Sequence, residues 1–238
     1  MSDLQPQERP IPFNGAMVRA ILHGDKSVTR RVMKVQPDED ASITVEHYNA
    51  TVINRQGDEE PGPEIFGAWW RDGEIGCKCP YGQPGDLLWV KESWSRDFAR
   101  HYPYDDVWYR ADGERASEFE ERDGVRGIWS PEHNELVPFK WRSGRFMPRR
   151  ASRILLEITS IRIERLQDIT DDQAVAEGVR QMTDGSCVYV GREGPGKLVT
   201  PWLTAKEAFA DQWSEVNGRG SWESNPWVWC VEFKRVRP

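Results

Sequence analysis

The feature that most constrains the fold is a long run of alternating apolar and polar residues at positions 154–166. A period of two is typical of a β-strand with one buried face. The apolar positions fall into two groups, first Ile154, Leu156 and Ile158, then Ile161 and Ile163. The change of phase at residues 159–160 predicts a β-bulge, which bends a strand as a small barrel requires. The run therefore predicts a curved sheet.

Other segments of the chain also have the pattern of strands. Strands are expected at residues 86–94, 107–110 and 227–236. Residues 36–64 form an acidic excursion rich in turn residues, and its brief apolar stretches indicate a hairpin. The tryptophans near the C-terminal strand are expected to belong to the core: Trp222, Trp227 and Trp229.

Three short helices are expected between the strands. The first spans residues 13–24, with Asn14 as its N-cap and Gly24 as its stop. Each of the other two begins at a capping box, one formed by Thr170 with Gln173 and the other by Thr204 with Glu207. Strands interrupted by short helices predict an α+β domain, with a small barrel or curved sheet and helices at its rim.

The charge and the cysteine content exclude several classes of protein. A net charge of −7 argues against a protein that coats duplex nucleic acid through bulk electrostatics. The N-terminus lacks the pattern of a signal peptide and no apolar run is long enough to span a membrane, so we expect a cytoplasmic protein. The four cysteines are expected to be reduced thiols, with no metal site: Cys77, Cys79, Cys187 and Cys230.

A polar segment at residues 24–31 follows the first predicted helix. If a strand begins near Thr29, Arg31 shares its face and Arg30 points the other way. A turn after the helix would bring Lys26 to the side of Thr29, so that an amine, a hydroxyl and a guanidinium converge. On this interpretation Arg30 is a surface charge. The alternative is that all three cations are solvated and Thr29 is an ordinary strand residue.

The order of Gly24, Lys26, Thr29 and Arg31 resembles the signature of the ASCH family, in which G-x-K-x-x-T-x-R follows the first helix. This family is related to the PUA-like RNA-binding barrels. Other segments resemble the longer ASCH proteins of phages and prophages, in the same order along the chain: residues 84–94, 147–154, 176–179 and 220–229.

The resemblance implies a fold and a domain organisation. The fold is a small PUA-like β-barrel with short helices at its rim. One domain would span residues 1–238, with insertions near 36–64, 96–145 and 183–200.

The resemblance also implies a reaction. ASCH relatives with an assigned activity are amidohydrolases that remove the acetyl group from N4-acetylcytidine, using a Thr nucleophile, a Lys proton acceptor and a Glu proton donor. Matched by motif, the first two are Thr29 and Lys26; Glu177 is the best match for the donor, and Glu92 is the competing carboxylate. No metal or cofactor is implied. Further residues are expected to line the substrate pocket: Arg31, Glu92, Trp94, Arg149, Ser152, Arg153 and Asn225.

Residues 140–153 hold six basic residues and no acidic one within an acidic chain. Arg side chains match phosphate oxygens, and Trp141 or Phe146 can stack on an unpaired base. The stretch therefore indicates a single-stranded nucleic acid as a partner. The alternative is that Arg149, Arg150 and Arg153 form ion pairs with acidic residues of neighbouring loops.

Three functions are compatible with these patterns. The first is hydrolysis of an amide on a modified pyrimidine nucleoside. The second is non-catalytic recognition of RNA or of modified DNA bases, with a flipped-out or single-stranded base held in the same pocket. The third is RNA cleavage, with the Lys and Arg residues stabilising phosphate charge. The sequence carries no signal for an oligomeric state.

Overall fold

The computed structural model describes residues 5–71, 73, 75–102, 104, 106–113, 119–182, 188–191 and 200–236. The chain forms two compact units. The first unit contains Met1–Arg9, Asp25–Leu88 and Glu157–Lys234, and the second contains Pro10–Gly24, Trp89–Leu156 and Arg235–Pro238. The predicted insertion at 96–145 lies entirely within the second unit.

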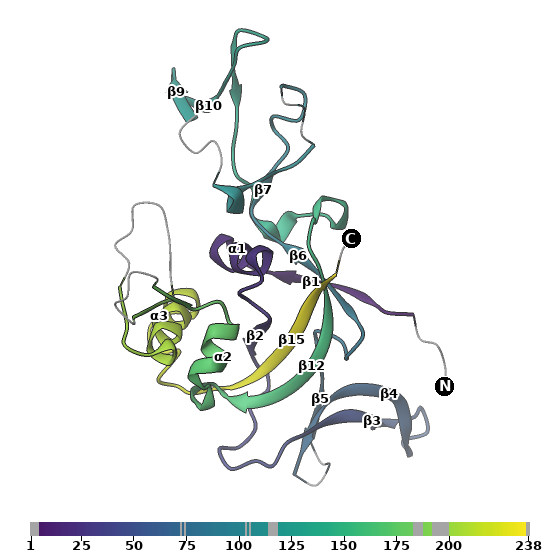
Figure 1. Ribbon diagram of the computed structural model, residues 1–238. Coiled ribbons are helices and arrows are strands. Elements are labelled where there is room, and N and C mark those ends of the chain that lie inside the picture. The colour runs from purple at the N-terminus through teal and green to yellow at the C-terminus, as the bar shows by residue number, and fades with distance from the viewer. Residues whose placement is uncertain are drawn as a thin grey trace. The chain divides into compact units, whose positions relative to one another are not determined.

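A five-stranded sheet contains the long strand predicted from the alternating run. Its strands are, in order, β1 (Glu8–Pro12), β6 (Leu87–Lys91), β12 (Leu155–Arg165), β15 (Trp227–Val236) and β2 (Val28–Val32). Figure 1 shows β12 and β15 side by side as long curved strands. The α+β class is confirmed. The pairing of the described strands leaves β1 and β2 as the two ends of this sheet, so it is not closed and the barrel stays a prediction.

The burial of β12 shows the change of phase in the middle of the strand, where Ile158 and Ile161 are buried and Thr159 between them is exposed. The alternation does not hold at the start of the strand, where Leu155 and Leu156 are both buried. In β15, by contrast, Val228–Val231 are all buried, so both faces of this strand are covered.

Two small sheets complete the strands of the first unit. Strands β3 (Thr44–Ile53) and β4 (Glu59–Trp70) form the hairpin that was expected at residues 36–64, and β5 (Ile75–Lys78) pairs with the end of β4. Strand β13 (Arg180–Gln181) pairs with β14 (Tyr189–Val190). Most of the predicted insertion at 183–200 lies outside the described residues.

The second unit is built from short elements. Its helices are α1 (Gly15–His23), η1 (Arg110–Asp112), η3 (Gly144–Phe146) and η4 (Arg149–Ala151), and its short strands are β7 (Trp94–Ser95), β8 (Trp108–Tyr109), β9 (Phe119–Arg122), β10 (Val125–Ser130) and β11 (Glu135–Pro138). Its aromatic core joins buried Phe98, Ile128, Val137 and Phe139 to half-buried Trp108, Phe119 and Trp141. The expected strand at 86–94 is interrupted between Lys91 and Trp94, where the Glu92 amide donates to the sulfur of Met147 at 3.4 Å.

The three predicted helices are confirmed together with their caps. In α1 the Asn14 side chain accepts from the Met17 amide, and Gly24 ends the helix at φ 89°. Helices α2 (Asp171–Ala176) and α3 (Ala205–Asn217) each begin at a complete capping box, and η5 (Leu166–Asp168) precedes α2. Residues of α2 and α3 share a core cluster with Val228 and Cys230, which explains why β15 is covered on its second face.

The cap of α3 gives a test of this local structure. Replacing Thr204 with alanine removes the acceptor for the Glu207 amide, and we expect the free energy of unfolding to fall by about 1 kcal/mol. Thr204→Ser keeps the hydroxyl and is the matched control. The measurement is urea unfolding followed by circular dichroism, and equal stability of the two variants would contradict the expected role of the cap.

No helix in the described part of the chain has both the length and the apolar character needed to cross a membrane. Cys77, Cys79 and Cys230 carry free thiols, while Cys187 lies outside the described residues. Burial raises the pKa of the Cys79 thiol to about 11. Within the described ranges, no group of three or more His, Cys, Asp or Glu side chains is arranged to hold a metal ion.

Candidate active site

The segment before β2 lies beside the end of α2, within the first unit. Strand β2 pairs with β15 along one edge, where Thr29 is opposite Val231. On the other edge the Ser27 amide donates to the Ala176 carbonyl at 2.9 Å, and Lys26 forms an isolated bridge with Glu177. Glu177 is the C-cap of α2, and Gly178 follows at φ 98°. The end of the helix therefore holds the Glu177 side chain against the segment that precedes β2.

Lys26 and Glu177 form a buried pair, each only 3 % exposed. The Lys26 ammonium donates to Oε2 of Glu177 at 2.5 Å and to the Glu177 carbonyl at 2.8 Å. Burial lowers the pKa of Lys26, Glu177 opposes this effect, and the charges of Arg31 and Arg30 lower the pKa further. The net result is a lowered pKa, so this amine loses its proton more readily than an exposed lysine does.

The interpretation of Arg30 as a surface charge is wrong. Its side chain has no exposed area, and its guanidinium donates to three side chains at once. The acceptors are Oε1 of Glu177 at 3.4 Å, Oε2 of Glu164 at 2.9 Å and Oε1 of Gln173 at 2.9 Å. Arg30 lies on the second face of β2, and this face is covered by residues of β12 and α2 rather than by solvent.

We call these five residues the Lys26 cluster: Lys26, Arg30, Glu164, Gln173 and Glu177. Arg162 donates to the second oxygen of Glu164 and also contacts Glu232. Burial would raise the pKa of Glu164, but the hydrogen bond and charge of Arg162 and the charge of Arg30 outweigh it, so the pKa is lowered. Glu164 is therefore an ionised anchor for Arg30.

Thr29 is 1 % exposed and lies on the face of β2 opposite to Arg30. Among the described residues, the Thr29 hydroxyl takes no part in the hydrogen bonds of the Lys26 cluster. Arg31, on the same face as Thr29, is half-buried; burial lowers its pKa, and the charges of Tyr81 and Glu177 oppose this effect without reversing it. Glu177 lies beside the edge of β2 that does not pair with β15, so its charge acts on side chains from both faces of the strand.

The lowered pKa of Lys26 predicts a pH dependence of stability. Between that lowered pKa and the ordinary value of 10.5, the unfolded chain binds a proton that the folded protein does not, so this group adds stability as the pH rises. We expect the difference in unfolding free energy between the wild type and Lys26→Met to increase across this interval. Urea unfolding of both proteins at a series of pH values measures it, and the cysteine and tyrosine contributions common to both cancel. A difference that stays constant with pH would show that the Lys26 pKa is not lowered.

The competing carboxylate, Glu92, lies in the second unit and has a different partner. Arg153 donates to both of its oxygens, at 2.9 and 3.0 Å, and also to both oxygens of Asp112. The Arg153 guanidinium lies 3.9 Å from the ring centre of Tyr109. Burial raises the pKa of Glu92, and the Arg153 hydrogen bond opposes that rise. Of the two carboxylates proposed as proton donor, Glu177 is the one that contacts Lys26.

The other expected pocket residues of the second unit have structural contacts. Trp94 is buried with Met147 and Ala151, and Arg142 lies over its ring at 5.8 Å. The Ser152 hydroxyl donates to the Val90 carbonyl at 2.8 Å. Arg149 begins η4 and is half-buried.

Asn225, in the first unit, is a turn residue. Its φ is 41°, and its side-chain oxygen accepts from the Gln167 amide at 2.8 Å. Of the neighbouring tryptophans, Trp229 is buried and Trp222 packs partly buried against the core shared by α2 and α3. Trp227 is half-buried beneath Arg165.

The basic stretch at 140–153 is divided between paired and exposed cations. Arg142 is paired with Asp97, and Arg153 with Glu92. Arg145 and Arg150 are exposed, as is 73 % of Phe146. Of the three arginines in the ion-pairing alternative, Arg153 is thus paired, Arg150 is exposed and Arg149 is half-buried.

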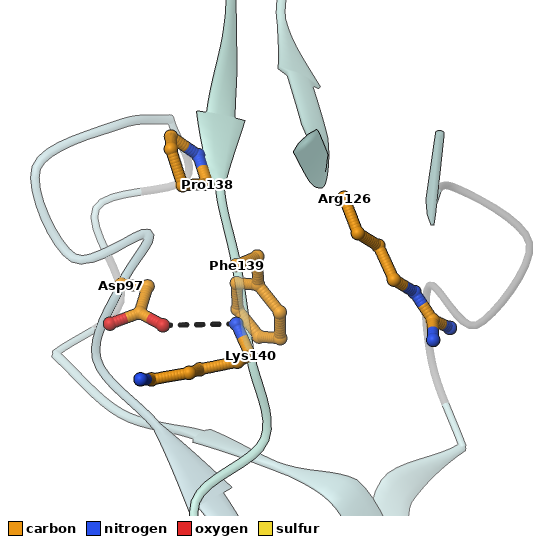
Figure 2. A pocket seen from close by; sticks show the side chains of 5 residues that line it. All are labelled: Asp97, Arg126, Pro138, Phe139 and Lys140. Atoms are coloured by element: carbon orange, nitrogen blue, oxygen red, sulfur yellow. Dashed lines mark hydrogen bonds between the residues drawn. The ribbon is translucent and has the colours of Figure 1, made fainter. Parts of the chain in front are cut away.

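A surface pocket of about 490 Å³ lies at the start of this stretch (Figure 2), lined by Asp97, Arg126, Pro138, Phe139 and Lys140. Asp97 accepts from the Lys140 amide at 3.0 Å, and its other oxygen is paired with Arg142. Figure 2 shows Phe139 between Lys140 and Arg126. The carboxylate is thus neutralised, while Arg126 and Lys140 are exposed cations.

Three members of the Lys26 cluster were not predicted from the sequence as site residues: Arg30, Glu164 and Gln173. Gln173 was identified only as part of a capping box, yet its side-chain oxygen accepts from both the Thr170 amide and Arg30. Glu164 stands in an alternating strand, where a charged residue is normally assigned to solvent. The roles of Arg30, Glu164 and Gln173 depend on contacts between segments more than a hundred residues apart, and a local sequence pattern does not predict such contacts.

Comparison of this chain with protein-family models, with curated proteins and with solved structures found no match. The ASCH resemblance therefore stays a prediction that depends on the motifs themselves.

Proposed function

We propose that this chain is a nucleoside-binding ASCH-type amidohydrolase with a PUA-like fold, and that it removes the acyl group from N4-acetylcytidine or a related modified pyrimidine. Thr29 is the nucleophile, Lys26 the proton acceptor and Glu177 the proton donor. The single observation that carries this proposal is the direct, buried hydrogen bond between the Lys26 amine and the Glu177 carboxylate.

The lowered pKa of Lys26 supports its role as the base. A Thr hydroxyl is a poor nucleophile until a base removes its proton, and an amine serves as that base only in its neutral form. Burial and the charges of Arg31 and Arg30 all favour the neutral amine. A lowered pKa favours the action of a lysine as a general base.

In the first half of the reaction the Thr29 oxygen attacks the amide carbonyl carbon while neutral Lys26 accepts the hydroxyl proton. Protonated Glu177 gives its proton to the exocyclic nitrogen as the carbon–nitrogen bond breaks. Cytidine leaves, and the acetyl group remains as an ester on Thr29. The Lys26 ammonium then returns its proton to the Glu177 carboxylate along their hydrogen bond.

In the second half water attacks the ester. Lys26 accepts a proton from the water and passes it to the departing Thr29 oxygen, which releases acetic acid. The net reaction consumes one water and restores all three side chains to their starting protonation states. It requires no metal or cofactor.

The test is incubation of the full chain with N4-acetylcytidine and a panel of other N4-acylated and modified nucleosides, followed by mass spectrometry. The proposal expects conversion of at least one acylated nucleoside to the free amine together with release of the acid. Binding detected by thermal shift without any conversion would favour non-catalytic recognition instead. Cleavage of an unmodified RNA oligomer would favour the third function.

A second candidate function, recognition of single-stranded nucleic acid, has its own support in the second unit. Exposed Phe146 offers a ring for base stacking, and Arg145 and Arg150, close to it in the sequence, are exposed cations. If this surface binds a single strand, affinity for a short RNA falls steeply between low and physiological salt. Fluorescence anisotropy with a labelled oligomer measures this, and a salt-independent affinity would exclude the candidate.

A further inference from the structure

The two oxygens of the Glu177 carboxylate are shared between two different cations. Lys26 contacts Oε2 at 2.5 Å, and Arg30 contacts Oε1 at 3.4 Å. Arg30 is not part of the motif that carries the ASCH resemblance, and none of the three functions considered above assigns it a role. It is nevertheless fully buried, as is the amine of Lys26.

The two cations differ in one property that matters for a proton-transfer site. An arginine side chain keeps its charge at every pH a protein experiences, whereas a buried lysine loses its proton readily. In the resting protein, loss of the Lys26 proton to solvent leaves Arg30 as the cation that contacts an ionised Glu177. Without Arg30, that carboxylate would be buried with no contacting cation, which is strongly unfavourable. The proposed reaction begins from the other state with neutral Lys26, in which Glu177 holds the proton.

Arg30 is itself held in place from two further elements. Glu164 of β12 and Gln173 of α2 both accept from its Nη2 atom at 2.9 Å. Glu164 in turn is held by Arg162, which donates to its other oxygen, Oε1. The guanidinium therefore has a fixed position relative to the strand and the helix that frame Glu177.

We propose that Arg30 is a positioning residue for the Lys26–Glu177 pair: its permanent charge keeps the carboxylate beside the amine in both protonation states of Lys26. By occupying Oε1 it leaves Oε2 as the oxygen that exchanges a proton with Lys26. The kinetic consequence rests on the proposed amidohydrolase function. The electrostatic consequence does not, because it concerns only the resting protein.

The electrostatic test is a carbon-13 NMR titration of the lysine ε-carbons in the full chain, with the Lys26 signal assigned by its absence in Lys26→Arg. The charges that act on Lys26 come from Glu177, Arg31 and Arg30. Arg30→Gln removes one of the two like charges and leaves Glu177 to Lys26 alone, so the Lys26 pKa is expected to rise. The matched control is Arg162→Gln, which removes a cation that contacts Glu164 and not Glu177, and it is expected to leave the Lys26 pKa unchanged.

Arg30→Gln leaves the partly buried Glu164 carboxylate with one cation fewer, which could prevent the variant from folding. A second variant therefore removes this unpaired charge as well. The double replacement Arg30→Gln with Glu164→Gln removes one charge of each sign and keeps amide groups that can hydrogen-bond to each other. It is expected to show the same rise. An unchanged Lys26 pKa in either folded variant, or an equal rise in Arg162→Gln, would overturn the proposal.

The kinetic test uses N4-acetylcytidine. Arg30→Gln is expected to lower kcat by about 10²-fold, as displacement of a positioned group typically does, with little change in KM because Arg30 is buried away from solvent. Arg30→Lys restores the charge but not the three simultaneous contacts, and is expected to recover part of the loss. A kcat equal to that of the wild type in Arg30→Gln would overturn the proposal. If the wild type converts no nucleoside, the proposed function fails, and the NMR titration alone decides the role of Arg30.

Discussion

Thr29→Ala is expected to lower the rate of N4-acetylcytidine hydrolysis by about 10⁴-fold or more, because it removes the atom that forms the acyl intermediate. The expected loss of folding stability is small, on the order of 1 kcal/mol, since the change deletes one methyl and one hydroxyl group. The Thr29 hydroxyl takes no part in the hydrogen bonds of the Lys26 cluster, so the charged network stays intact. Product formation by mass spectrometry and urea unfolding measure the two effects.

Two matched replacements distinguish the effect of losing the Thr29 hydroxyl from the effect of changing the shape of the side chain. Thr29→Ser keeps the nucleophilic oxygen and is expected to retain measurable turnover. Thr29→Val keeps the branched shape, loses the hydroxyl, and is expected to be as inactive as Thr29→Ala. Turnover by Thr29→Val on a verified substrate would show that Thr29 is not the nucleophile.

Glu177→Ala is expected to cost about 3 kcal/mol or more of folding stability, because removing one member of a buried ion pair leaves its partners uncompensated. Here the partners are Lys26 and Arg30, whose side chains have no exposed area. The Lys26 ammonium also loses its strongest hydrogen-bond acceptor. The free energy of unfolding from urea titration measures the effect.

Glu157→Ala is the comparison that makes this value informative. Glu157 also forms an ion pair with a lysine, Lys234, at 3.0 Å, but both side chains are partly exposed. Exposed pairs of this kind contribute about 0–1 kcal/mol. If the two replacements lower the free energy of unfolding equally, the buried ion pair of Glu177 stabilises the protein no more than an exposed pair does. Glu177→Gln, which keeps the shape and one acceptor, is expected to lie between them.

The features that could be predicted from the sequence are those determined by neighbours along the chain. Asn14 and Gly24 bound the first helix because their side chain and backbone preferences act within one turn. The capping boxes at Thr170 and Thr204 act over three residues, and both are complete in the structure. The change of phase between Ile158 and Ile161 of β12 was likewise predicted from the sequence of that strand alone.

The features that could not be predicted depend on which element covers which face. Arg30 follows buried Thr29 in β2, and the sequence alone did not show whether the face of β2 opposite to Thr29 is exposed to solvent or buried. It is buried because β12 contributes Glu164 and α2 contributes Gln173, both far away in the sequence. The same reason applies to β15, where α2 and α3 bury Val228 and Cys230.

For the candidate site, the motif selected Lys26 and Glu177, and the structure brings these two side chains into contact. Their catalytic roles stay predictions, and the sequence alone left Glu92 open as the donor. The motif gave no indication that a second cation shares the carboxylate. Glu92, in turn, belongs to an ion-pair network of the second unit with Arg153 and Asp112.

Helix α2 has only six residues, and a helix this short does not persist without contacts to the rest of the protein. Its last turn is anchored by the Ser27 amide and by the Lys26 amine, which hydrogen-bonds the Glu177 carbonyl as well as the carboxylate. Fraying of this one turn therefore separates the proposed acid from the proposed base. The rate at which the backbone amides near Glu177 exchange with deuterium thus reports how often the site comes apart, and it does so before any substrate is known.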